Sequence, residues 1–272
     1  MTVPVPETTP IKLELITRRP AGKTKQTPLL FIHGKWHGAW CWDEHFLPYF
    51  VDHGYECIAP SLRGHSRSEG HEKLRWTSIA DYVSDVEQVA GQLESPPVII
   101  GHSMGGFITQ KYLESHNLPG AVLLAPVPYS GLWPSTWTVF RRHPGLVLRM
   151  IVTLSMYPLV ESIAIARECL FSADMPDELV EKYQKQMQDE SFRAYLDELG
   201  LNLVRPQRVK TPLLVLGAAN DVVIPTRTVE ATAHIYGTRA KFFPNMAHDA
   251  MLETGWEQIA EMILNWLDER GL

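Results

Sequence analysis

Short apolar runs alternate with longer amphipathic stretches along most of the chain. The run at residues 29–32, Leu-Leu-Phe-Ile, is continuously apolar, as expected of a strand that is covered on both faces. Further strand-like runs occur at residues 11–17, 55–59, 98–100, 121–125, 213–216 and 241–243. Helical periodicity predicts helices over residues 43–53, 78–93, 104–116 and 253–267. Because parallel strands need crossover connections, this alternation predicts an α/β fold with a mostly parallel sheet and helices on both faces.

One segment, residues 127–206, breaks this alternation. It has clustered prolines, no convincing strand pattern and a charged helical run from residue 176 to residue 203. A helical insertion of this length between two strands is typical of a lid or cap over one edge of a sheet. The sequence therefore predicts a core made of residues 1–126 and 207–272, with a helical cap over residues 127–206.

Composition and charge exclude several classes of protein. The 272 residues are 45% apolar and 21% charged, with a formal net charge of −6, so we expect a globular protein that binds no nucleic acid. The three cysteines form neither a disulfide framework nor a metal-ligand spacing. Residues 1–7 lack the features of a signal peptide, and no stretch supplies the ~20 apolar residues that span a bilayer. We expect a cytoplasmic protein without a transmembrane segment; a monomer and a homodimer both fit the sequence.

The most informative stretch is a G-x-S-x-G pattern that lies directly after a predicted strand and before a predicted helix. It reads Gly-His-Ser-Met-Gly over residues 101–105, with Ser103 at its centre. A serine at so tight a strand-to-helix turn is exposed at the edge of the sheet and lies at a helix N-terminus. The same Gly-His-Ser tripeptide recurs at residues 64–66, but there no glycine follows at the second position. We predict that Ser103 is a nucleophile and that Ser66 is an ordinary loop serine.

A nucleophilic serine needs a base, and the base needs a carboxylate that fixes its tautomer. Asp221 follows the predicted strand at residues 213–216, and His248 follows the one at residues 241–243. The sequence therefore predicts a triad of Ser103, His248 and Asp221. Taken alone, Asp221 and His248 would each fit an ordinary turn or cap residue equally well. Asp249 adjoins His248 but is expected to point elsewhere.

Two backbone donors are expected to stabilise the oxyanion of a tetrahedral intermediate. One is the N–H of Met104, which follows the nucleophile, and the other should come from the loop after an earlier strand. Residues 33–36, His-Gly-Lys-Trp, form that loop, in which Gly34 permits close approach of the backbone. We predict the amide of Lys35 as the second donor, with the amide of Trp36 as the alternative.

Four side chains are predicted to contact substrate. Trp36 and His102 adjoin the predicted oxyanion donors and the nucleophile, whereas Trp133 and Trp137 lie four apart in the insert and would share one helix face. No metal ligand set is expected, because the glycines that follow His33 and His37 argue against a helix that would align the two rings.

At these residues the chain resembles the α/β-hydrolase superfamily. Its residues 33–42, His-Gly-Lys-Trp-His-Gly-Ala-Trp-Cys-Trp, look like the branch that contains plant methylesterases and hydroxynitrile lyases. Residues 61–68 are similar to the D-x-R-G-x-G-x-S loop of bacterial esterases, lipases and cofactor-free haloperoxidases. The resemblance implies an α/β-hydrolase fold with a cap and catalysis without a cofactor. Since position 103 is Ser and not Asp, it argues against haloalkane dehalogenases and epoxide hydrolases.

The leading functional hypothesis is a serine hydrolase that cleaves a carboxylic ester of a small to medium apolar acid through an acyl-enzyme. A thioester or a lactone would suit the same residues. Two alternatives stay open, because fold does not determine reaction. One is a lyase, perhydrolase or cofactor-free oxygenase of the same superfamily, and the other is a ligand receptor that retains the triad as a binding feature.

Overall fold

The computed structural model describes residues 10–272. Residues 1–7, on which the expectation of no signal peptide rests, lie outside the described residues. Within residues 10–272, seven strands form one sheet in the order β1-β3-β2-β4-β5-β6-β7. Only β1 is antiparallel to its neighbour. The strands are β1 (Leu15–Arg18), β2 (Leu29–Ile32), β3 (Cys57–Pro60), β4 (Val98–His102), β5 (Ala121–Leu124), β6 (Leu213–Ala218) and β7 (Ala240–Phe243). The predicted α/β fold with a mostly parallel sheet is confirmed.

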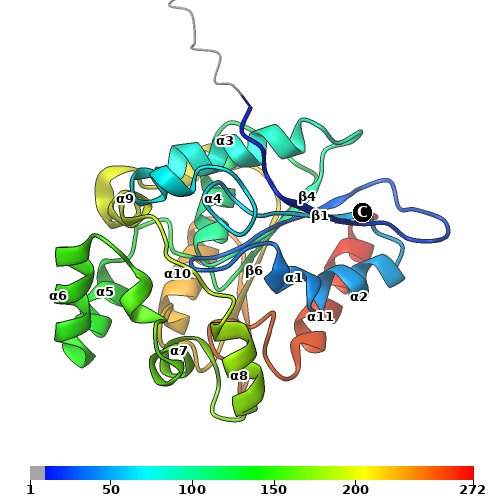
Figure 1. Ribbon diagram of the computed structural model, residues 1–272. Helices are drawn as coiled ribbons and strands as arrows, with labels where there is room; N and C mark the ends of the chain where they lie inside the picture. Colours follow the sequence, from blue (N-terminus) through cyan, green and yellow to red (C-terminus); the bar gives the residue numbers. More distant parts are fainter. Residues whose placement is uncertain (1–9) are drawn as a thin grey trace, which may run out of the picture.

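The central strands are buried on both faces by helices. Every residue of β2, β4 and β5 is buried, as their continuously apolar sequences predict. Figure 1 shows α2 and α11 together on one face of the sheet, with α3 and α4 on the other. The helices of this part are α1 (Trp40–Asp43), α2 (Phe46–Asp52), η1 (His71–Trp76), α3 (Ile79–Ala90), α4 (Met104–Tyr112), α10 (Thr226–Ile235) and α11 (Trp256–Glu269). The helix predicted over residues 43–53 is two short helices, α1 and α2.

The sheet brings the ends of four strands to one edge. Ile32 of β2 is paired with Gly101 of β4, and the carboxyl ends of β4 and β5 are likewise in register. Ala218 of β6 is paired with Phe243 of β7. Because these strands are parallel, the loops that follow β2, β4, β6 and β7 lie along the same edge. They contain Lys35, Ser103, Asp221 and His248, and Met104 follows as the first residue of α4.

The described chain between β5 and β6 forms helices and loops and contains no strand. Its helices are α5 (Trp133–Arg142), α6 (Pro144–Thr153), η2 (Tyr157–Leu159), α7 (Ile163–Leu170), α8 (Asp177–Gln184), α9 (Phe192–Leu196), the π-helical turn η3 (Asp197–Leu201) and η4 (Pro206–Arg208). In Figure 1, α5, α6 and α7 lie at the left and lower left of the view, and α8 lies at the bottom centre. The helical run predicted over residues 176–203 is interrupted, because α8 ends at Gln184 and α9 begins only at Phe192. The division of the chain into a core and a cap stays a prediction.

Candidate active site

Ser103 occupies a sharp turn between β4 and α4. Its backbone has φ 52° and ψ −116°, a region that non-glycine residues rarely adopt and that costs about 1–3 kcal/mol. Backbone hydrogen bonds hold the turn, since the Ser103 N–H donates to the Leu124 carbonyl (3.0 Å) and its carbonyl accepts from the Val127 N–H (3.0 Å). A Cβ on Gly105 would overlap the carbonyl oxygen of Ile32. The second glycine of the pattern is therefore required for α4 to approach β2.

Ser103, His248 and Asp221 form one continuous hydrogen-bonded chain. The Ser103 Oγ lies 2.8 Å from His248 Nε2, and His248 Nδ1 lies 2.7 Å from Asp221 Oδ2. Because a carboxylate can only accept, Nδ1 carries the hydrogen and Nε2 is left to accept from the serine hydroxyl. All three residues are buried. This arrangement lets His248 take the proton of Ser103 while Asp221 fixes the tautomer of the imidazole.

The orientation of Asp221 is fixed by the residues that follow it. Its Oδ1 accepts hydrogen bonds from the N–H groups of Val223 (2.7 Å) and Ile224 (2.8 Å), which leaves Oδ2 for His248. The turn-like sequence after Asp221 thus helps to hold its carboxylate in place.

The loop after β2 lies against the turn of Ser103. A Cβ on Gly34 would lie 2.8 Å from His102 Nδ1 and 3.0 Å from the Cβ of Ser103, so glycine permits a closer approach than a larger residue would. Trp36 has φ 66°, another strained position for a bulky residue. Met104 is the first residue of α4, and its N–H is among the donors that a helix leaves without an intrahelical acceptor. Both stretches predicted to supply oxyanion donors therefore flank Ser103.

A cavity opens beside Ser103 and His248. The cavity is walled by the loop after β2 and by helices of the segment between β5 and β6. Its apolar wall consists of Trp36, Val127, Leu132, Val139, Val147, Met150, Met156, Leu159, Cys169 and Val223. The other lining residues are Lys35, Ser135, Thr136 and Tyr195. The cavity thus suits a mainly apolar ligand next to the serine hydroxyl.

Two tryptophans predicted to line a pocket do not line this cavity. Trp133 and Trp137 are 62% and 60% exposed, and the lining residues of α5 are Ser135, Thr136 and Val139. The sequence correctly implied that the tryptophans share a helix face, but that face points outward. Their predicted contact with substrate is therefore wrong for this cavity.

His102 is also absent from the cavity wall, contrary to prediction. It is fully buried behind the triad, and its Nε2 lies 2.9 Å from the carbonyl oxygen of His248, to which it donates. Burial, together with the neighbouring His248, lowers the pKa of His102 to about 3, so the ring is neutral. His102 supports the backbone of His248 and does not reach a ligand in the cavity.

Asp249 points away from the triad, as expected. Its Oδ2 lies 3.0 Å from His37 Nε2, and His37 Nδ1 lies 2.6 Å from the carbonyl oxygen of Lys35. Burial alone would lower the pKa of His37, but the Asp249 carboxylate raises it above its ordinary value. A buried ion pair therefore joins the loop that carries His248 to the loop that carries Lys35.

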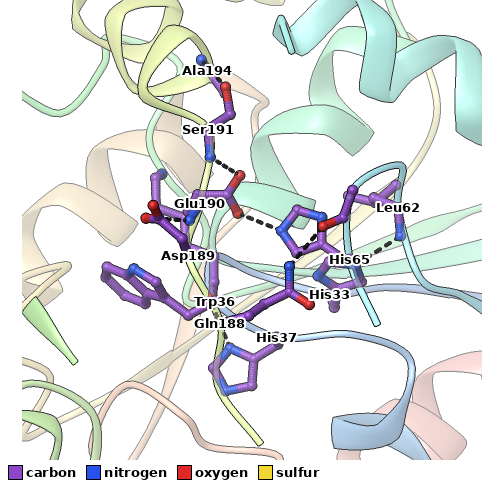
Figure 2. Close-up of polar contacts among 12 residues, drawn as sticks. His33, Trp36, His37, Leu62, His65, Gln188, Asp189, Glu190, Ser191 and Ala194 are labelled. Atoms are coloured by element: carbon purple, nitrogen blue, oxygen red, sulfur yellow. Dashed lines mark hydrogen bonds and ion pairs between the residues drawn. The ribbon is translucent and has the colours of Figure 1, made fainter. Parts of the chain in front are cut away.

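The polar segment between α8 and α9, which was predicted to be helical, binds two loops of the sheet edge. The backbone N–H of Gln188 donates to the carbonyl of Trp36 (3.0 Å). Its side-chain oxygen accepts from the Ser66 N–H (2.7 Å), and its side-chain nitrogen donates to the Gly64 carbonyl (2.7 Å). Figure 2 shows Gln188 close to Trp36. A helix over this segment would have directed these groups elsewhere.

Glu190 of the same segment forms a second buried ion pair. Its Oε2 lies 3.1 Å from His65 Nε2, while its Oε1 accepts from the Tyr82 hydroxyl (2.8 Å) and the Ser191 N–H (2.6 Å). The dashed lines of Figure 2 follow the contacts of Glu190 with His65 and Ser191. The sequence pattern does not predict this pair, because its members lie in segments far apart along the chain.

No group of three His, Cys, Asp or Glu residues that could hold a metal ion occurs within residues 10–272. Across the same range, no helix has both the length and the apolar character needed to cross a membrane.

Comparison with protein families agrees with this geometry. The model of the "Alpha/beta hydrolase family" matches residues 29–262. The chain belongs to the alpha/beta hydrolase family. This match spans both the sheet and the helical segment between β5 and β6, so the resemblance inferred from the sequence motifs is confirmed at the level of the family.

Individual relatives are more distant. The chain is 24% identical over 210 residues to a pyrethroid hydrolase from Sphingobium wenxiniae. The aligned region covers 73% of this chain and 72% of that protein. It is 35% identical over 109 residues to a non-heme chloroperoxidase from Streptomyces lividans, but this match spans only 37% of either protein.

Solved structures of similar fold include two esterases. The esterase EaEST from Exiguobacterium antarcticum has a TM-score of 0.75 at 18% identity and covers 95% of this chain and 96% of its own. A thermophilic esterase from Thermogutta terrifontis has a TM-score of 0.76 at 19% identity. The match covers 98% of this chain and 97% of the esterase. At such low identity these likenesses establish the fold alone.

Proposed function

We propose that the protein is a serine esterase that cleaves carboxylic esters of small to medium apolar acids. The observation that carries this proposal is the hydrogen-bonded chain of Ser103, His248 and Asp221, which opens onto an apolar cavity. A serine that only capped the helix would need neither the base nor the carboxylate behind it.

In the proposed reaction, Ser103 Oγ attacks the ester carbonyl while His248 Nε2 takes its proton. Asp221 orients the imidazole and stabilises the imidazolium. The N–H groups of Met104 and of Lys35, or of Trp36 in its place, donate to the oxyanion. The C–O bond to the alcohol then breaks, and His248 returns the proton to the departing oxygen. Water, activated by His248, hydrolyses the acyl-enzyme in the same two steps and frees Ser103.

The proposed substrate class follows from the wall of the cavity. Most of its lining side chains are apolar, including Val147 and Met150 of α6, so a hydrocarbon chain would lose water-exposed surface on entry. We infer that residues 127–206 act as a cap that shapes this acyl site. The pyrethroid hydrolase and esterase names of the relatives support hydrolysis of an ester as the reaction class.

The chain offers a matched control for testing the nucleophile. Ser103→Ala should abolish labelling by a fluorophosphonate probe and lower kcat for p-nitrophenyl alkanoates by at least about 10³-fold. Ser66→Ala removes the hydroxyl from the other Gly-His-Ser tripeptide and should leave labelling and kcat unchanged. The esterase proposal fails if Ser103→Ala is labelled as well as the wild type or turns over esters at the wild-type rate.

A second candidate is perhydrolysis, in which hydrogen peroxide replaces water as the attacking group and a peracid is released. The match to a non-heme chloroperoxidase favours it. Both reactions would pass through the same acyl-enzyme. Water and hydrogen peroxide would then compete to attack its acyl group. Acyl transfer to peroxide that exceeds hydrolysis at millimolar peroxide would favour perhydrolysis, whereas hydrolysis unaffected by peroxide would exclude it.

A further inference from the structure

The side chain of Lys35 presents an unexplained buried charge in the wall of the cavity. Lys35 is only 5% exposed and lines the same cavity as Ser103 and His248. Its Nζ is paired with Glu198 of η3, which is fully buried. Removing an ammonium and a carboxylate from water costs several kcal/mol each, so such a pair is weak evidence for a stabilising role. The proposed esterase mechanism uses only the backbone of Lys35 and leaves its side chain without a task.

The pair has hydrogen-bonding capacity to spare. An ammonium group has three N–H donors, and among residues 10–272 only Glu198 accepts from Lys35 Nζ. The second carboxylate oxygen of Glu198, Oε1, is buried and has no partner in the same part of the chain. Donors left without acceptors in a buried site weaken the fold unless a ligand satisfies them. Two of the three Lys35 N–H donors therefore have no acceptor among residues 10–272, beside the cavity that Lys35 lines.

Other polar groups lie on the same side of the cavity. Tyr195 precedes Glu198 by three residues, so the two share one face of the helical stretch that joins α9 and η3. The Tyr195 hydroxyl lies 3.0 Å from the Thr136 hydroxyl, and both residues line the cavity. The Leu132 N–H donates to the Glu198 carbonyl (3.0 Å), which holds the start of α5 against η3. Thr136 and Tyr195 thus lie beside the pair of Lys35 and Glu198 in a wall that is otherwise mainly apolar.

The charges around Lys35 determine which kind of oxygen atom its ammonium group would bind. When Glu198 is ionised, its pair with Lys35 is neutral as a whole. Burial raises the pKa of Glu198 to about 7, in spite of Lys35, and the nearby Glu190 and Asp197 contribute to the rise. A substrate carboxylate at Lys35 would add a further negative charge beside these acids, at low dielectric, where like charges repel strongly. An uncharged oxygen avoids this repulsion and still accepts from the ammonium group.

We propose that Lys35 Nζ binds an uncharged oxygen atom, such as an ether, keto or hydroxyl oxygen, on the acyl chain of the substrate. The substrate class is then an ester of an oxygen-bearing apolar acid. This inference rests on the proposed esterase function, because it places the acyl chain in the cavity beside Ser103.

An oxygen scan of the acyl chain tests this subsite. Wild type and Lys35→Met are compared on p-nitrophenyl heptanoate and on analogues in which an ether oxygen replaces one methylene at each successive position. The measured quantity is the ratio of kcat/KM for an oxygen analogue to that for heptanoate. A hydrogen bond to a charged group should make this ratio about 10–100-fold higher in the wild type than in Lys35→Met at one or two positions. Equal ratios at every position in the two proteins would overturn the proposal.

The role of Glu198 gives the test a second arm. Glu198→Gln removes the negative charge while it keeps the shape of the side chain, so Lys35 becomes an uncompensated cation. This variant should improve kcat/KM for an acyl chain that ends in a carboxylate by about tenfold relative to heptanoate. No gain would contradict the argument from charge.

The outcomes separate the two proposals. If fluorophosphonate does not label Ser103 in the wild type, the esterase function itself fails. If Ser103 is labelled in all variants but the ratios stay constant, only the subsite fails. Should Lys35→Met not fold, the double variant Lys35→Met/Glu198→Leu replaces the buried pair with apolar side chains, and its ratios are measured in the same way.

Discussion

The buried ion pair of His65 and Glu190 yields a quantitative prediction. Burial alone would raise the pKa of Glu190, but the His65 imidazolium and the hydrogen bonds to the carboxylate lower it to about 2. Burial would likewise lower the pKa of His65, but Glu190 raises it above its ordinary value. Both side chains are completely buried, so solvent screens their attraction little. Replacing one partner and leaving the other buried should therefore lower the free energy of unfolding measurably.

The size of the effect depends on what replaces the carboxylate. Glu190→Leu leaves His65, the Tyr82 hydroxyl and the Ser191 N–H without their acceptor, and should cost about 3–5 kcal/mol. For a chain of this size that corresponds to a fall in Tm of about 6–20 °C. In Glu190→Gln the side-chain oxygen can still accept from Tyr82 and Ser191, so the cost should be only about 1–3 kcal/mol. The glutamine variant thus measures the charge, and the leucine variant adds the lost hydrogen bonds.

The pKa shifts of His65 and Glu190 determine how the stability contributed by the pair changes with pH. The raised pKa of His65 means that its contribution is fully present below about pH 6.5 and is lost as the pH rises through the folded-state value. The lowered pKa of Glu190 means that its contribution is present above about pH 4.5 and is lost only as the pH falls towards 2. The difference in stability between wild type and Glu190→Gln should therefore be largest between about pH 4.5 and 6.5 and should shrink in alkali.

Urea unfolding followed by tryptophan fluorescence, at pH 6 and again at pH 9.5, measures this difference. Glu181→Gln serves as the control, because Glu181 forms an ion pair with Lys185 on the surface of α8. This substitution should change the free energy of unfolding by less than about 0.5 kcal/mol at either pH. Equal destabilisation of Glu190→Gln at the two pH values would refute the assignment of a charged pair. Equal stability of Glu190→Leu and Glu190→Gln would refute the role of the hydrogen bonds.

Three further predictions concern the site and its surroundings. Trp133→Ala and Trp137→Ala should each keep kcat/KM for p-nitrophenyl esters within about twofold, since both rings point away from the cavity; a tenfold loss would contradict their placement. Gly105→Ala should abolish activity or soluble expression, because its methyl group would overlap the backbone of β2; an active, stable variant would show that the turn can relax. Burial lowers the pKa of His33 and of His102 to about 3, so their ring resonances in an NMR titration should not shift between pH 5 and 8.

The sheet and the serine turn could be predicted because their sequence signals are local. Each strand is an apolar run bounded by turn residues, and all seven predicted runs overlap an observed strand. The turn at Ser103 needs glycine at position 105, where no Cβ fits against β2. The order of Asp221 and His248 along the chain, each after its own strand, was enough to bring both to the edge where Ser103 lies.

Side-chain partners that join distant segments could not be predicted. Lys35 and Glu198 lie 163 residues apart, and no periodicity relates them. On α5, the spacing of Trp133 and Trp137 shows that they share a face, but tertiary packing decides which face is buried, and here it is the one with Ser135. The helix predicted over residues 176–203 is interrupted between Gln184 and Phe192. Polar side chains of this stretch, such as that of Gln188, bind other loops instead of solvent.

The contacts of the helical segment with the sheet edge couple the cavity to the triad. Gln188 binds the backbone of Trp36, next to the predicted oxyanion donors. Glu253, in the loop after His248, accepts from both the N–H (2.5 Å) and the hydroxyl (2.6 Å) of Ser172, between α7 and α8. Directional bonds of this kind fix relative positions more narrowly than apolar packing does. A ligand that shifts the helices would therefore also shift the loops that carry the candidate catalytic groups, so acyl-chain specificity in the proposed esterase should be expressed in kcat as well as in KM.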